Sequence, residues 1–248
     1  MKTLTAGIII IGDEILSGRT QDTNSNFIAN KLITSGIQLD QICVIHDNEE
    51  KIIEKVIHFH KNYTYVFTTG GIGPTHDDIT SQSISKAFNK KFCFHPEAFN
   101  ILKNYYGEND FNEGRQKMAK MPEGVELIPN PLTVAPGFII KNVFVLPGVP
   151  EILKKMFDNI LENIEKGKPK KIINININLY ESTIANKLAK IQKQYPECTI
   201  GSYPYFNYIK KTGGVNIVVS SWTLEKLDNI ADEIKKMVSL LGGKSSIV

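Results

Sequence analysis

Apolar and polar positions along the first two thirds of the chain predict strands and helices in alternation. Residues 6–11 form a nearly continuous apolar run, as expected for a parallel strand covered by helices on both faces. Residues 41–46 and 65–67 predict two further strands, because runs of β-formers are bounded there by turn residues. Residues 27–35 and 49–63 instead place apolar side chains at helical spacing. This order favours a doubly wound, mostly parallel sheet with right-handed crossovers.

Further elements follow in the same region. A helix is expected after Asp78, and two more at residues 96–106 and 113–121. Residues 138–146 predict two short strands that turn near Lys141. A helix then begins at Pro150, because proline is tolerated at the first helical position, and it runs to about residue 165.

The last third of the chain has its own pattern. Residues 166–171, Lys-Gly-Lys-Pro-Lys-Lys, combine charge with helix breakers and predict a linker. Isoleucines then alternate with asparagines over residues 173–178, which predicts a strand with one buried face. The remaining pattern predicts a helix, two strands and a final helix at residues 184–191, 199–205, 215–222 and 224–238. We therefore expect two domains, residues 1–166 and a small α+β domain at 171–248.

Composition restricts the compartment and the partner. The 248 residues are 42% hydrophobic, which is enough for a sizeable core, and the net charge of +3 demands neither nucleic acid nor a membrane surface. The N-terminal apolar run is too short for a signal peptide or a membrane span. Cys43, Cys93 and Cys198 stand singly, which argues against disulfides and structural zinc. We expect a cytoplasmic protein whose partner is a small molecule, with no nucleic acid and no membrane.

The stretch from Tyr65 to Asp78 joins an apolar strand to a glycine-rich loop. Gly70, Gly71 and Gly73 lack Cβ, so the backbone can take positive φ and bring several N–H groups to an anion such as phosphate. The loop is not a P-loop, because no Lys-Ser or Lys-Thr follows the glycines, and it is not a dinucleotide fingerprint. Ligands bind outside the carboxyl ends of strands in open α/β sheets. We therefore expect the binding or active site here.

Two acidic pairs follow the first and third predicted strands. Asp13 and Glu14 come after the first strand, and Asp77 and Asp78 end the glycine loop. Each pair can consist of solvated loop residues, and Asp77 can cap the following helix. The two pairs can instead hold a divalent cation opposite a phosphate if the strands are neighbours.

Two other positions are open between a functional and a structural role. Arg19 can reach an anionic ligand or face the solvent. Pro147 and Gly148 precede the helix that begins at Pro150, and a helix N-terminus beside a glycine can bind an anion. The same turn is also an ordinary connection between a strand and a helix.

Several motifs occur in a fixed order along the chain. They are residues 12–19 with Asp22-Thr-Asn24, residues 68–80, 112–119, 135–138 and 146–150. In this order they resemble the molybdopterin-binding (MoaB/Mog-like) domain as found in the competence/damage-inducible protein A family. Residues 181–182 and 200–204 resemble the small domain appended in that family. The resemblance covers nearly the whole chain.

The resemblance implies a three-layer α/β/α sandwich with a mostly parallel sheet, plus a small C-terminal α+β domain. It also implies that the glycine loop binds the phosphate of a nucleotide or pterin. Some family members hydrolyse the pyrophosphate of ADP-ribose-like or flavin dinucleotides with the help of a metal. The expected function is such a hydrolase, or else a molybdopterin-binding or adenylylating protein of molybdenum-cofactor synthesis. An interaction module with a relict pocket is a third reading. We expect a homo-oligomer, and no deamidase domain because the sequence ends at Val248.

The motifs assign roles to individual residues. Asp77 and Asp78 are expected to be catalytic, and a divalent cation, Mg²⁺ or Co²⁺, is expected on Asp13, Glu14 and Asp78. Substrate or phosphate is expected on Asn24, Arg19, Gly70, Gly71, Ile72, Gly73, Thr75, Pro147 and Gly148. A side chain at Gly71 is expected to block the ligand and to leave thermal stability nearly intact.

Overall fold

The computed structural model describes residues 3–207, 212–223 and 227–248, and these form two compact units. The division lies between Gly167 and Lys168, inside the basic segment 166–171. Each unit has its own hydrophobic core.

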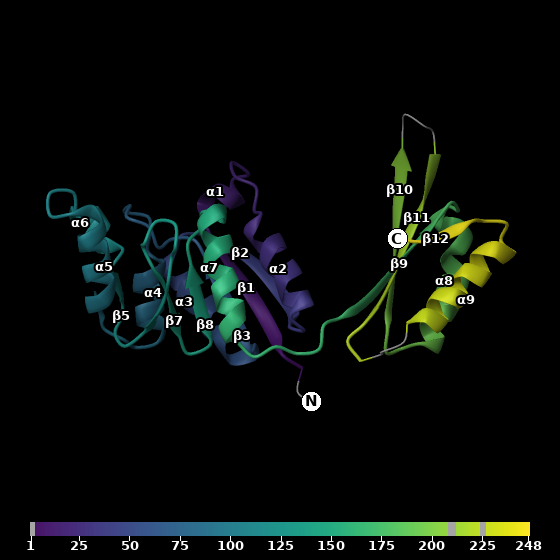
Figure 1. The fold of residues 1–248 in the computed structure, drawn as a ribbon, viewed down its shortest axis with the longest axis horizontal. Helices are drawn as coiled ribbons and strands as arrows, with labels where there is room; N and C mark the ends of the chain where they lie inside the picture. The colour runs from purple at the N-terminus through teal and green to yellow at the C-terminus, as the bar shows by residue number, and fades with distance from the viewer. Residues whose placement is uncertain (1–2, 208–211, 224–226) are drawn as a thin grey trace. The chain divides into compact units, whose positions relative to one another are not determined.

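The first unit is built on a six-stranded sheet in the order β2-β1-β3-β8-β7-β6 (Figure 1). Its strands are β1 (Thr5–Ile11), β2 (Gln38–Ile45), β3 (Tyr65–Thr69), β6 (Glu126–Ile128), β7 (Gly137–Ile140) and β8 (Val143–Leu146). The four strands β2, β1, β3 and β8 run parallel, and β7 and β6 add an antiparallel edge. The mostly parallel sheet is confirmed, and β6 is a strand that the pattern did not predict.

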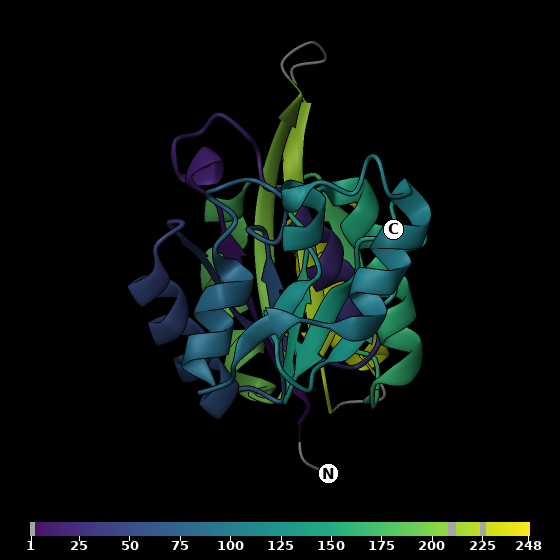
Figure 2. The same ribbon diagram turned by 90° about the vertical axis from the view of Figure 1, so that its left-hand side faces the viewer.

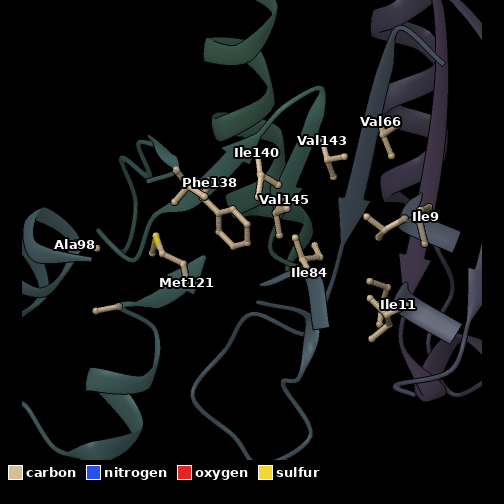
Figure 3. Close-up of a cluster of buried hydrophobic side chains, with 14 of the residues drawn as sticks. Ile9, Ile11, Val66, Ile84, Ala98, Met121, Phe138, Ile140, Val143 and Val145 are labelled. Atoms are coloured by element: carbon tan, nitrogen blue, oxygen red, sulfur yellow. The ribbon is translucent and has the colours of Figure 1, made fainter. Parts of the chain in front are cut away.

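Helices cover both faces of this sheet. They are α2 (Asn24–Thr34) and α7 (Pro150–Asn163) on one face, and α3 (Glu49–Asn62), α4 (Thr80–Ala87) and α5 (Pro96–Tyr106) on the other. In β1, Ile8 and Ile10 pack with α2 and α7, whereas Ile9 and Ile11 pack with the opposite layer. Figure 3 shows part of that second cluster, including Ile9, Ile11 and Ile84 of α4. The predicted three layers are therefore confirmed.

Smaller elements decorate the first unit. They are α1 (Asp13–Leu16), α6 (Glu113–Lys117) and a two-stranded sheet of β4 (Phe92–Phe94) and β5 (Lys120–Pro122). Figure 2 views the unit from the end that carries α5 and α6. The helix predicted at 113–121 is too long, because α6 ends at Lys117 and Met121 pairs with Cys93 in the small sheet.

The second unit is a four-stranded sheet in the order β10-β11-β9-β12 with two helices packed on it. Its elements are β9 (Lys171–Ile177), α8 (Glu181–Gln194), β10 (Thr199–Asn207), β11 (Thr212–Ser221), α9 (Asp228–Leu240) and β12 (Ser245–Ile247). Ile175 and Ile177 pack against the helices, as their alternation with asparagine predicts. The predicted start of the last helix at Leu224 lies outside the described residues, and β12 was not predicted.

Two features of the described residues bear on the compartment. Cys43, Cys93 and Cys198 are all free thiols. In the described ranges, no helix combines the length and the apolar character that a membrane crossing requires.

Candidate functional site

Four loops meet where the parallel strands end. In register, Ile11 pairs with Ile45, and Thr69 pairs with both Ile10 and Leu146, so the carboxyl ends lie at one edge of the sheet. The Gly12 N–H donates to the Ile45 carbonyl oxygen at 3.2 Å, and the Gly70 N–H donates to the Leu146 carbonyl oxygen at 3.1 Å. Because β2 and β3 flank β1, the order of connections reverses between β1 and β3. That reversal is where open α/β sheets bind ligands.

The glycine loop after β3 has a backbone that side chains would disturb. Gly70 and Gly71 have φ angles of +103° and +68°. A Cβ atom at Gly70 would lie 2.1 Å from the Ile11 carbonyl oxygen, so only glycine fits there. A Cβ atom at Gly71 would lie 2.2 Å from Oγ1 of Thr80, which is fully buried. The expectation that a side chain at Gly71 leaves stability intact is therefore wrong, because α4 packs directly behind this glycine.

Thr75 holds the two carboxylates that end the loop. Its N–H donates to Asp78 Oδ2 at 2.8 Å, and its hydroxyl lies 2.5 Å from Asp77 Oδ1 and 2.6 Å from Asp78 Oδ2. The hydrogen bond from the Thr75 hydroxyl is the main cause that lowers the pKa of Asp77. Asp77 does not cap the next helix, since α4 begins at Thr80 with Ile79 at the N-cap position. The helix-cap alternative for Asp77 is therefore wrong, and the alternative of a solvated loop residue stays open.

Asp47 is a carboxylate that the sequence reading overlooked. Its Oδ2 accepts the Asp13 N–H at 3.0 Å, and its Oδ1 lies 3.5 Å from the place where a Cβ of Gly71 would stand. Burial raises the pKa of Asp47, and the negative charges of Asp13, Glu14 and Asp77 raise it further. Asp47 stands two residues after the end of β2 at Ile45, so the rule that ligands bind at the carboxyl ends of strands could have marked it as a candidate, although not its contact with Asp13.

His46 pairs with one of the predicted metal ligands. Its Nδ1 lies 2.6 Å from Asp13 Oδ1. Glu14 turns back over Gly12, where its carboxylate oxygens lie 2.7 Å from the position of a Cβ. The negative charges of Asp13, Glu14 and Asp77 therefore all act on Asp47, and Thr75 holds Asp77 beside Asp78.

Asn24, the first residue of α2, connects this helix to the end of β3 and to the loop that precedes α7. It is 5% exposed, and its Nδ2 donates to the Gly148 carbonyl oxygen at 2.8 Å and to Thr69 Oγ1 at 3.4 Å. Its Oδ1 is buried and has no hydrogen-bond partner among the described residues, and neither has Thr80 Oγ1. A buried acceptor without a partner is costly, and a water, an ion or a ligand group normally accounts for it.

The remaining predicted site residues make fewer contacts with the glycine loop and its carboxylates. Gly148 lies against the glycine loop, since a Cβ there would stand 3.5 Å from the Gly70 Cα, and Pro147 comes between it and β8. Ile72 packs partly against the hydrophobic core. Arg19 is exposed in the turn after α1 and forms no hydrogen bond or ion pair with another residue of the described ranges. It stays a predicted ligand contact.

No ready-made cluster of metal ligands accompanies these loops. Among the described residues, no three His, Cys, Asp or Glu side chains are close enough to hold an ion by themselves. Asp13, Glu14 and Asp78 are therefore not drawn together as a closed metal site. The fold defines an α/β protein, and the carboxyl edge of its sheet, where these loops lie, is the place where open α/β sheets bind ligands.

Comparisons with known proteins agree with this class. The family model described as "Probable molybdopterin binding domain" matches residues 7–166, and the one described as "FAD synthase, middle domain" matches residues 172–241. The chain therefore belongs to the molybdopterin-binding domain family and carries a second domain like the middle domain of FAD synthase. The resemblance inferred from the motifs is confirmed.

Individual relatives cover different shares of the chain. A protein from Archaeoglobus fulgidus is 35% identical over 232 residues, which are 94% of this chain and 97% of that protein. A relative from Alkaliphilus metalliredigens, whose name places it among competence-damage inducible proteins, is 35% identical over 162 residues, or 63% of this chain and 39% of that protein. The crystal structure of CinA from Thermoplasma acidophilum is similar at 33% identity with a TM-score of 0.62, over 65% of this chain and 99% of that one.

Proposed function

We propose that the first unit hydrolyses the pyrophosphate bond of a nucleotide with the help of a divalent cation, Mg²⁺ or Co²⁺. The observation that carries this proposal is the gathering of carboxylates beside a glycine loop with positive φ. Asp47 lies next to Gly71 and within the electrostatic reach of Asp13, Glu14 and Asp77. A glycine loop with positive φ favours the binding of a phosphate through backbone N–H groups, and neighbouring carboxylates favour a cation between them.

The donors present fit a hard cation that arrives with its substrate. Mg²⁺ prefers oxygen ligands and is usually bound by one or two carboxylates together with substrate phosphates. This explains how a site can be selective for the metal complex of a nucleotide although no three described side chains form a closed ion site. Asp13 and Asp77 are the carboxylates that would hold the ion, and Thr75 links Asp77 to Asp78. The ion would polarise the phosphoryl oxygen and lower the pKa of an attacking water.

The carboxylates are suited to different tasks because their environments move their pKa values apart. Hydrogen bonding lowers the pKa of Asp77, so this side chain stays ionised and supplies negative charge. Burial and like charges raise the pKa of Asp47, which makes it the better proton acceptor for an attacking water. The Gly71 backbone would hold the phosphate, and Asn24 would support the loop through its hydrogen bond to the Gly148 carbonyl oxygen.

A flavin dinucleotide is the substrate class we favour over ADP-ribose. Residues 172–241 resemble the middle domain of FAD synthase, and this resemblance supports a flavin-containing ligand. The test is incubation of the protein with FAD and with ADP-ribose in Mg²⁺ or Co²⁺, with nucleotide products separated by chromatography and a chelator as the control.

Variants make this test specific. Asp47→Asn is expected to lower the rate about a hundredfold, the range of a lost proton-transfer group. Asp77→Asn is expected to lower the rate because it removes a negative charge that would hold the ion. Asp40→Asn, which removes an exposed carboxylate of β2, is the matched control and is expected to be neutral. The proposal fails if wild-type protein releases no product with either metal, or if both site variants keep the wild-type rate.

Molybdopterin binding without hydrolysis is the second candidate, and the family match over residues 7–166 supports it. A pterin carries a phosphate that the same glycine loop would accept. Titration with a pterin phosphate in the absence of metal separates the two functions. Tight pterin binding together with inert FAD and ADP-ribose would favour this candidate over the hydrolase.

A further inference from the structure

Residues 74–76, at the end of the glycine loop, border a cleft of the first unit. This cleft has a volume of about 530 Å³, and its walls are residues 74–76 of the loop, Phe94 of β4, the helix α6 and Lys120 of β5. Small-molecule sites typically occupy about 300–1,000 Å³. The cleft is therefore large enough for one half of a dinucleotide, and neither Asp77 nor Asp78 lines it.

One residue separates the cleft from the carboxylates. The Thr75 N–H donates to the Asp78 carboxylate, and the Thr75 hydroxyl donates to the Asp77 carboxylate. On the other side of the residue, the Thr75 carbonyl oxygen accepts a hydrogen bond from Lys117 Nζ. Asn112 caps α6 by accepting the Arg115 N–H at 3.1 Å, which fixes the helix that carries Lys117. A ligand that passes over Thr75 would thus contact the carboxylate side with one phosphate and the cleft with the rest of the molecule.

The lining of the cleft combines an aromatic ring with positive charge. Phe94 is 42% exposed, and Lys120 Nζ lies 4.8 Å from the centre of its ring. Lys117 and His76 line the same hollow, and Glu113 is the acidic side chain there. An aromatic face beside two lysines suits a flat heterocycle attached to a phosphate, because rings stack on aromatics and ammonium groups pair with phosphate.

We propose that this cleft binds the second nucleoside monophosphate of a dinucleotide whose pyrophosphate lies on the glycine loop. The proposal rests on the proposed function and specifies its substrate as a molecule with an aromatic ring on that side of the scissile bond. The ring stacks on Phe94, and Lys120, on its flexible stem, leaves the ring face to pair with the adjoining phosphate.

The test compares a ligand that has a ring with one that lacks it. FAD and ribose 5-phosphate are titrated calorimetrically into the full chain in cold Mg²⁺ buffer, and the FAD is checked by chromatography to be intact. Phe94→Leu removes the aromatic face and keeps an apolar contact for Phe99, its ring neighbour at 5.2 Å. Tyr105→Leu removes another exposed ring, on α5 and outside the cleft, and is the matched control.

We expect Phe94→Leu to weaken FAD binding about tenfold, which is the loss expected when one base no longer stacks on an aromatic ring. The affinity for ribose 5-phosphate is expected to stay unchanged. Tyr105→Leu is expected to change neither affinity. Two results would contradict the proposed role of the cleft and would leave the proposed hydrolase activity unaffected. One is an unchanged FAD affinity in Phe94→Leu, and the other is an equal loss of affinity for both ligands in a Phe94→Leu protein with a wild-type melting curve. Wild-type protein that binds neither ligand would overturn both proposals.

Discussion

Substitution of Gly71 by alanine probes the packing that holds the phosphate loop in place. The residue has a φ angle of +68°, and an L-residue in this conformation costs about 1–2 kcal/mol. The new Cβ would also stand 2.2 Å from Thr80 Oγ1, and overpacking of that kind costs about 1–3 kcal/mol. We therefore expect Gly71→Ala to lower the free energy of unfolding by about 2–5 kcal/mol, from the sum of these two effects.

A second substitution isolates the steric part of that loss. Thr80→Ala removes the oxygen that the new Cβ would meet, whereas Thr80→Val keeps a methyl group in its place. Gly71→Ala combined with Thr80→Ala is expected to recover about 1–3 kcal/mol relative to additivity, and the combination with Thr80→Val is expected to recover none.

The assay is urea unfolding followed by circular dichroism, with tryptophan fluorescence as an internal control. Trp222 is the only tryptophan and lies in the second unit, so its fluorescence reports that unit alone. We expect the dichroism transition of the first unit to shift while the fluorescence transition stays in place. Free energies for Thr80→Ala and Gly71→Ala that add within about 0.5 kcal/mol would refute the predicted contact.

Three further results are expected. The folded pKa of Asp47 is raised, so the stability linked to this group is present below its unfolded pKa and is lost as pH rises through the folded value. Asp47→Asn should therefore raise the melting temperature at pH 7 and have a smaller effect in acid; a lower melting temperature at pH 7 would contradict this. Asn24→Ala should cost about 1–3 kcal/mol in urea unfolding, since it leaves the Gly148 carbonyl unpaired, whereas Asn30→Ala on the exposed face of α2 should cost little. Limited trypsin digestion should cut first within residues 168–171, at the bond after Lys170, because trypsin does not cut before Pro169 and the Gly167 N–H is held by the Ser35 carbonyl oxygen at 3.0 Å. A first cut elsewhere, shown by mass spectrometry, would refute this.

The glycine loop was predictable because its signal is local. Three glycines between a short apolar run and two acidic residues specify a strand end, a positive-φ turn and carboxylates in one stretch. The structure adds the tertiary cause of the glycines at two positions. Gly70 must clear the Ile11 carbonyl oxygen of β1, and Gly71 must clear Thr80 of α4.

Contacts between distant segments could not be predicted in the same way. Asp47 approaches Asp13 because β1 and β2 are neighbours in parallel register, and a lone aspartate after a strand carries no local mark of this. The helix predicted to reach Met121 stops early for a similar reason. Pairing of Met121 with Cys93 in the small sheet overrides the helical pattern of the segment.

The net charge of the whole chain conceals a difference in charge between the two units. The net charge of +3 combines a first unit in which acidic residues slightly outnumber basic ones with a second unit that has twice as many lysines as acidic residues. A carboxylate-rich site repels a dinucleotide that carries two phosphate charges, so binding needs a cation or a positive field to offset that repulsion. The proposed ion supplies the offset at the site itself. Substrate capture should accordingly fall when a chelator removes the ion, because the repulsion between the carboxylates and the phosphates is then no longer offset.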